Sequence, residues 1–123
     1  MAKRVLSVGQ CAPDHAAISD FLRVHFQAEV APARLLDDAV QKLRGEAFDL
    51  VLVNRKLDAD YSDGLDVVRA IKSDPELAHV PVMLVTNYPE HQQAAAAAGA
   101  VPGFGKLEFH KPETIEKLRP YLS

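Results

Sequence analysis

The sequence holds little of what marks several large classes of protein. A single cysteine, Cys11, excludes an internal disulfide. Fourteen basic residues stand against seventeen acidic ones, for a formal net charge of -3, and no basic stripe marks a nucleic-acid surface. No apolar run approaches the length of a membrane span, and the apolar stretch after the charged N-terminus is too short for a signal peptide. These absences predict a cytoplasmic protein of bacterial type with neither a nucleic-acid nor a membrane partner.

What the sequence does contain fits one domain spanning residues 1–123. The chain is 48% hydrophobic and 25% charged, which allows a buried core and a soluble surface. Apolar runs typical of strands alternate with segments of helical periodicity, and the β-α unit occurs five times. The predicted strands lie at 4–8, 28–31, 49–54, 81–85 and within 101–109, and the predicted helices begin near Pro13, Leu35, Leu65, Pro89 and Pro112.

This alternation predicts an α/β fold with a parallel sheet and helices on both faces. We expect a single five-stranded sheet in the flavodoxin-like order 2-1-3-4-5, a (βα)5 three-layer sandwich. Pro32, at the end of the second strand, favours an edge position for that strand.

The stretch 48–54 is predicted to be the centre of the sheet. Its residues 50–53 form an unbroken apolar run, which is typical of a strand buried on both faces. The run ends in one polar side chain, Asn54, and a charged loop follows. Ligands of open α/β sheets bind outside the carboxyl ends of the strands, so Asn54 lies where a fold of this class does its chemistry.

The chain resembles a response-regulator receiver domain over essentially its full length. The order and spacing of several segments together carry this resemblance, since no single motif is highly specific. They are the apolar strands 5–8 and 49–54, Gly64-Leu65 at the start of the third helix, residues 81–86, Gly99-Ala100 and Lys106.

The resemblance implies a phosphorylation site in which only half of the usual groups are present. Receivers carry a nucleophilic aspartate after the third strand, two acids after the first strand that help to hold Mg²⁺, and a hydroxyl and a lysine that stabilise the phosphoryl oxygens. In this sequence the nucleophile position is Asn54 and the acid positions are Gly9 and Gln10. Thr86 and Lys106 fill the hydroxyl and lysine positions.

Two departures from the family pattern concern the lysine and the aromatic switch residue. Lys111 is the alternative to Lys106, because a Lys-Pro pair of the kind usual in receivers occurs at Lys111-Pro112. The position three before Lys106, where receivers tend to carry an aromatic switch residue, is Gly103, with Phe104 beside it. We expect Lys106 to donate a hydrogen bond to the amide oxygen of Asn54. Asn54→Asp is then expected to be tolerated, because the lysine can pair with the new acid.

Other groups near these positions offer alternatives. Asp14, or the loop acids Asp58, Asp60 and Asp63, could rebuild a metal site, but a solvated loop and a helix N-terminus explain them more simply. Cys11 precedes a helix N-terminus, a placement that favours thiol reactivity, and His15 follows it by four residues. We predict no metal site, no cofactor and no catalytic residue.

Two functions remain open at the level of sequence. The first is a degenerate receiver, a binding module that works without phosphorylation. It would dock a protein partner, or a second copy of the chain, on the face of helix four, strand five and helix five, where Tyr88, Phe104 and Tyr121 could act as anchors. The second is an active sensor on the same scaffold. It could be an unconventional phosphoacceptor, a small-anion pocket or a redox module at Cys11.

Overall fold

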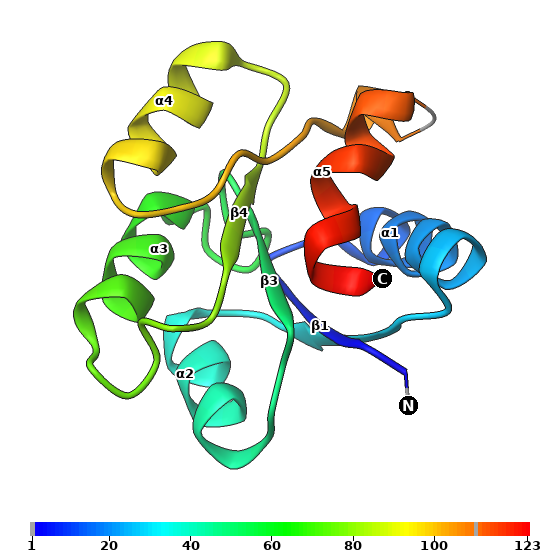
Figure 1. Cartoon of the computed structure of the whole chain (residues 1–123). Helices are drawn as coiled ribbons and strands as arrows, with labels where there is room; N and C mark the ends of the chain where they lie inside the picture. Colours follow the sequence, from blue (N-terminus) through cyan, green and yellow to red (C-terminus); the bar gives the residue numbers. More distant parts are fainter. Residues whose placement is uncertain (1, 110) are drawn as a thin grey trace.

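A sheet of four parallel strands runs through the centre of the molecule in the order β2-β1-β3-β4 (Figure 1). The computed structural model describes residues 2–109 and 111–123. The strands are β1 (Arg4–Val8), β2 (Glu29–Ala33), β3 (Leu50–Asn54) and β4 (Val82–Val85). The predicted flavodoxin-like parallel sheet is confirmed for these four strands.

Helices cover both faces of this sheet and make a three-layer sandwich (Figure 1). On one face lie α1 (Ala12–Phe26) and α5 (Pro112–Leu122), and on the other lie α2 (Leu36–Gly45), α3 (Gly64–Ser73) and α4 (Pro89–Ala97). In the described part of the chain, no helix combines the length and the apolar character that crossing a bilayer requires.

The central strand β3 is buried on both faces, as its sequence predicts. Leu50, Val51, Leu52 and Val53 are all 0% exposed. Because successive side chains point to opposite faces, Leu50 and Leu52 pack with the core beside α1 and α5, while Val51 and Val53 pack with the core beside the other three helices. Asn54 ends the strand at the carboxyl edge of the sheet.

The second strand lies at the edge of the sheet and extends two residues further than the predicted range 28–31. Gln27, with a left-handed φ of 56°, ends α1, and the strand then runs parallel to β1 with Pro32 opposite Ser7. A proline is tolerated there because an edge strand leaves some of its N–H groups unpaired.

The prediction of a fifth strand within 101–109 is wrong. This segment makes an isolated bridge between Phe104 and Val85, and it then turns into a short 3-10 helix, η1 (Lys106–Glu108). Two backbone hydrogen bonds still tie it to β4, from Val101 N to Val82 O at 2.9 Å and from Thr86 N to Phe104 O at 3.0 Å. The segment therefore follows β4 without forming a regular ladder.

The side chain of Gln92, from α4, explains why the ladder is interrupted. Its Nε2 donates to Leu84 O at 2.9 Å, and its Oε1 accepts from Gly103 N at 3.1 Å. The Gln92 amide is thus hydrogen-bonded to Leu84 O and Gly103 N, two groups that would bond to each other if the ladder continued. Position 103 also has no room for a side chain, because a Cβ there would lie 2.3 Å from Leu84 O. Gln92 therefore fastens α4, β4 and the segment 98–105 together.

We predict that Gln92→Ala lowers the free energy of unfolding by about 1–3 kcal/mol, because Leu84 O and Gly103 N lose their partner in a part-buried site. Gln93→Ala is the matched control, since Gln93 is the exposed neighbour on the same helix and should change stability by less than about 0.5 kcal/mol. Urea unfolding of both variants measures the difference. Equal stabilities would show that the amide bridge contributes nothing.

Candidate functional site

A cavity of about 240 Å³ opens at the carboxyl edge of the sheet, between the loops that follow β3 and β4. Asn54, Thr86 and Lys106, three of the residues singled out in the sequence, line it together. Gly9, Gln10 and Lys111 are not among its lining residues. The Lys111 Nζ instead lies 3.9 Å from Glu108 Oε2. The other polar residues that line the cavity are Arg55, Lys56, Asn87 and Tyr88.

Asn54 uses its amide nitrogen to join the loops after β1 and β3. Nδ2 donates to Gly9 O at 3.3 Å and to Lys56 O at 2.8 Å. Both hydrogens of the amide are therefore engaged by backbone carbonyls. This leaves Oδ1 as the side-chain polar atom of Asn54 that is free to meet the cavity.

The Gly9 position is closed by an apolar side chain. Leu57, 1% exposed, packs so tightly against Gly9 that a Cβ there would lie 2.3 Å from Leu57 Cδ2 and 3.0 Å from Leu57 Cα. The φ of Gly9 is also positive, at 76°, which strains any residue with a side chain. An acid at this position would therefore collide with the loop that follows β3.

Gln10, the second acid position, lies outside the cavity. Both polar atoms of its amide are buried and have no hydrogen-bond partner among the described residues. A carboxylate there would carry a charge into the same setting, whereas the neutral amide carries only a dipole.

Lys106 pairs with Asp14 and not with Asn54, so the predicted hydrogen bond between Lys106 and Asn54 is wrong. Lys106 Nζ donates to Asp14 Oδ2, 2.5 Å away, across 92 residues of sequence. A carboxylate is a stronger acceptor for an ammonium group than an amide oxygen is, and Asp14, in the first turn of α1, is within reach. An acid introduced at position 54 would therefore have to compete with Asp14 for this lysine.

The pKa of Asp14 is lowered from its ordinary value, chiefly by the hydrogen bond from Lys106. Partial burial opposes this effect, while a hydrogen bond with Cys11 and the charge of Lys106 reinforce it. The pair thus favours a charged carboxylate that partly neutralises the lysine at the cavity.

A chain of contacts through His91 organises the other side of the cavity. Arg55 Nε donates to His91 Nε2 at 3.0 Å, and His91 Nδ1 lies 3.2 Å from Thr86 Oγ1. Because Nε2 accepts, the neutral ring carries its proton on Nδ1 and donates to the threonine. Sequence reasoning missed Arg55 and His91, since no recognised motif spacing joins residues 36 apart.

The remaining sequence candidates do not form a second site. His15 Nε2 contacts Ser19 Oγ at 3.4 Å, and His15 Nδ1 has no hydrogen-bond partner among the described residues, so the suggested Cys11–His15 pair is not made. The described residues contain no group of three or more His, Cys, Asp or Glu side chains that could hold a metal ion.

The three loop acids are exposed. Asp60 accepts hydrogen bonds from the N–H and hydroxyl of Ser62, which lower its pKa, and Asp63 caps α3 by accepting from Leu65 N. These contacts give Asp60 and Asp63 structural roles in the turn and the helix that follow β3.

The suggested aromatic anchors differ in their accessibility. Phe104 is 1% exposed and packs against Phe109 in the core, so the expectation that it anchors a partner is wrong. Tyr121 is partly buried against the same core, and Tyr88 is 58% exposed beside the cavity. Phe104, which was expected on the docking face, is thus internal.

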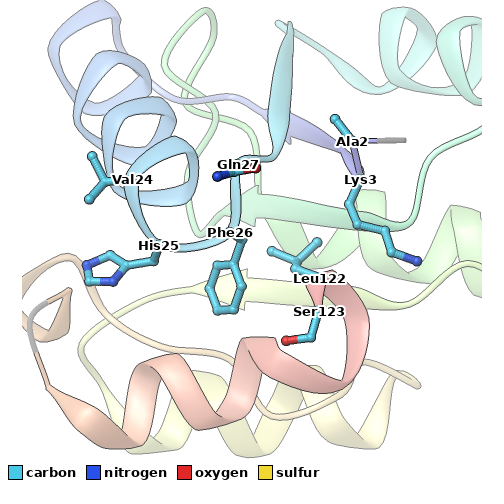
Figure 2. A pocket seen from close by; sticks show the side chains of 8 residues that line it. All are labelled: Ala2, Lys3, Val24, His25, Phe26, Gln27, Leu122 and Ser123. Carbon is cyan, nitrogen blue, oxygen red and sulfur yellow. The ribbon is translucent and has the colours of Figure 1, made fainter.

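A second cavity, of about 570 Å³, lies near both ends of the chain, away from these residues. Figure 2 shows that it lies between the last turn of α1, the residues before β1 and the end of α5. None of the residues singled out in the sequence lines it.

A family of known proteins matches most of this sequence. Residues 12–120 match the family described as "Response regulator receiver domain". A putative response regulator from Chloroflexus aurantiacus J-10-fl superposes with a TM-score of 0.85 at 19% identity, over 99% of this chain and 98% of that one.

Two further solved structures show the same fold. Chemotaxis protein CheY4 of Vibrio cholerae gives a TM-score of 0.76 at 22% identity, with 100% of each chain covered. NtrX from Brucella abortus gives 0.77 at 25% identity, over 99% of this chain and 27% of NtrX. The family match covers most of the sequence, and these structures share its fold. The chain therefore belongs to the response regulator receiver domain family, whose members act in two-component signalling.

Proposed function

We propose that this receiver domain signals as a binding module, by contact with a protein partner and without accepting a phosphoryl group. The observation that carries the proposal is the state of Asn54, at the position where receivers place their nucleophilic aspartate. Its amide is a poor nucleophile, and its nitrogen donates to the carbonyls of Gly9 and Lys56. The proposed function involves no catalysis and no cofactor.

The residues near Asn54 do not fit Mg²⁺. This hard cation prefers oxygen ligands, carboxylates above all, in near-octahedral geometry. Among the residues that the structure describes, no carboxylate lines the cavity. Gly9 brings no side chain, and the carbonyls of Gly9 and Lys56 already accept from Asn54. Leu57, packed on Gly9, occupies the space that an acid would need.

The lysine of the cavity has a partner of its own. Lys106 donates to Asp14, so its charge is balanced within the domain and does not depend on a covalent phosphate. Asp58, the remaining candidate for an unconventional phosphoacceptor, is exposed and does not line the cavity that holds Lys106 and Thr86. These contacts support the binding module over the active phosphoacceptor.

For the docking surface we propose the face made by α4, the segment 98–105 and α5. Gln92 links α4 to this segment through a hydrogen bond with Gly103 N. Tyr88, just before α4, is exposed, and Ala96 and Ala97 leave part of α4 free of bulky side chains. A protein partner or a second copy of the chain would occupy this face.

We predict that the protein gains no mass when it is incubated with acetyl phosphate and Mg²⁺ and then weighed intact. The expectation follows from the missing nucleophile at position 54, because a carboxamide does not form an acyl phosphate. A receiver with an aspartate at the end of its third strand, treated in parallel, serves as the positive control. A stoichiometric adduct of phosphoryl mass would contradict the proposal.

We predict that Asn54→Asp lowers stability by about 1–3 kcal/mol at pH 7, because carboxylate oxygens would face the carbonyls of Gly9 and Lys56 in place of two donors. These carbonyls raise the pKa of the new acid in the folded state. The loss is therefore largest above that pKa and shrinks as falling pH protonates the acid.

Asn87→Asp is the matched control, since Asn87 acts as an acceptor toward Leu107 N and an acid can keep that contact. Urea unfolding at pH 7 and pH 5, with and without millimolar Mg²⁺, measures both variants. If Mg²⁺ stabilised Asn54→Asp more than the control, the claim that this site does not fit the cation would fail.

A further inference from the structure

His91 joins the loop after β3 to the first turn of α4 through two contacts of different kinds. Its Nε2 accepts from Arg55 Nε at 3.0 Å, and its Nδ1 lies 3.2 Å from Thr86 Oγ1. An arginine side chain can only donate, so the first contact needs an unprotonated Nε2. The second contact has no such requirement, because Nδ1 carries a hydrogen in the neutral ring described above and also in the charged ring. The two contacts therefore differ in their response to protonation of His91.

Protonation of His91 would turn the contact with Arg55 from attraction into repulsion. Nε2 would then carry a hydrogen of its own and would have no lone pair to offer to the N–H of Arg55. The charged ring would also lie beside a guanidinium that no acid neutralises, since no salt bridge within residues 2–109 and 111–123 involves Arg55. Two like charges in direct contact repel each other.

The other charges near His91 do not favour a protonated ring. His91 lies in the first turn of α4, where the positive end of the helix dipole disfavours a cation. Lys56 and Lys106 line the cavity together with Arg55 and add positive charge. Glu90 precedes His91 in the sequence, but it is exposed, and adjacent residues of a helix do not face each other.

The elements packed around His91 supply no acid to balance a charge on it. Among the described residues, no salt bridge joins His91 to a carboxylate. Tyr88 contributes an aromatic ring whose centroid lies 5.3 Å from that of the imidazole. The charged residues of α3, which packs against α4, bond elsewhere, since Asp66 pairs with Arg69 and Lys72 donates to two backbone carbonyls. The acids of the loop after β3 are exposed, and they are Asp58, Asp60 and Asp63.

We propose that the Arg55–His91 contact is a pH-sensitive switch, which joins the loop after β3 to α4 while His91 is neutral and releases it when the ring is protonated. Histidine is the side chain that takes up a proton between about pH 5 and 8, and His91 is only half-buried. Release frees Arg55 and the first turn of α4, beside the proposed docking face, whereas Gln92 keeps its bonds to Leu84 and Gly103. The inference goes beyond the proposed function, because the switch belongs to the domain alone and needs no partner.

The position of the proton on the neutral ring is the first test. Long-range ¹H–¹⁵N spectra of the ¹⁵N-labelled full chain at pH 8 should show a protonated Nδ1 and an unprotonated Nε2 for His91. A neutral ring protonated on Nε2 could not accept from Arg55, and that result would overturn the inference.

A pH titration of the same sample follows the switch from the side of Arg55. The backbone amides of Arg55 and Lys56 should shift in step with protonation of the His91 ring as the pH falls from 8 to 5. His91→Gln should abolish this shift, because the glutamine oxygen can accept from Arg55 but does not titrate. His79→Gln is the matched control, since His79 is an exposed histidine between α3 and β4, and it should leave the shift unchanged. A shift that persists in His91→Gln would contradict the proposal.

A double-mutant cycle separates the switch from a general effect of charge. Arg55→Met removes the donor and His91→Phe the acceptor, and urea unfolding of the single and double variants at pH 8 and pH 5 gives the coupling between the two positions. At pH 8 the coupling should favour the folded state by a factor of about three or more in the unfolding equilibrium constant, as a hydrogen bond from a charged donor allows. At pH 5 it should vanish or change sign, because the contact is then repulsive.

An equal coupling at both pH values would show that protonation does not open the contact, and the inference would fail. This failure is distinct from a failure of the proposed function, which depends on a covalent adduct or a Mg²⁺-dependent gain. The two proposals are therefore tested by separate observations.

Discussion

The site depends on two hydrogen bonds donated by one amide. Asn54 Nδ2 joins the carbonyl of Gly9, after β1, to the carbonyl of Lys56, after β3. An amide nitrogen can make both contacts, whereas an ionised carboxylate can make neither. With this donor in place the two loops close on each other, and Leu57 packs over Gly9 in the space where receivers keep an acid. The neutral side chain at position 54 therefore shapes the backbone around it as well as removing a nucleophile.

The polar side chains around this amide each have a partner within the domain. Lys106 is held by Asp14, Arg55 by the neutral ring of His91, and Thr86 by two donors that leave its own hydrogen free. Beside β4, the amide of Gln92 hydrogen-bonds both Leu84 O and Gly103 N, and so it links β4 to the segment 98–105. A receiver of the usual kind couples an acidic pocket to a movable aromatic ring. This domain instead has a cavity lined by Arg55, Lys56 and Lys106, next to the segment 98–105, which Gln92 holds by a hydrogen bond to Gly103.

Features that depend on residues close together in the sequence could be predicted, whereas contacts between residues far apart in the sequence could not. The buried strand β3 and the order of the first four strands were predictable, because apolar runs and β-α alternation are local patterns. The absence of acids at Gly9, Gln10 and Asn54 could also be read directly. The interruption of the fifth strand could not be predicted from the sequence. It results from the side chain of Gln92, which accepts a hydrogen bond from the backbone N–H of Gly103, 11 residues further along the chain. The pairing of Lys106 with Asp14 joins residues 92 apart, which no local pattern predicts. The packing of Leu57 against Gly9 also has no signature in the sequence.

The most direct test of the account is a comparison of Gly9→Ala with Gly45→Ala by urea unfolding. Gly9→Ala is expected to lower the free energy of unfolding by about 2 kcal/mol or more, because the new methyl group meets Leu57 and the backbone keeps a positive φ. Gly45, which has nothing within 4 Å of an added Cβ, should lose nothing or gain slightly in its helix. If the two variants proved equally stable, position 9 would have room for a side chain, and the claim that the acid pocket is physically closed would be contradicted.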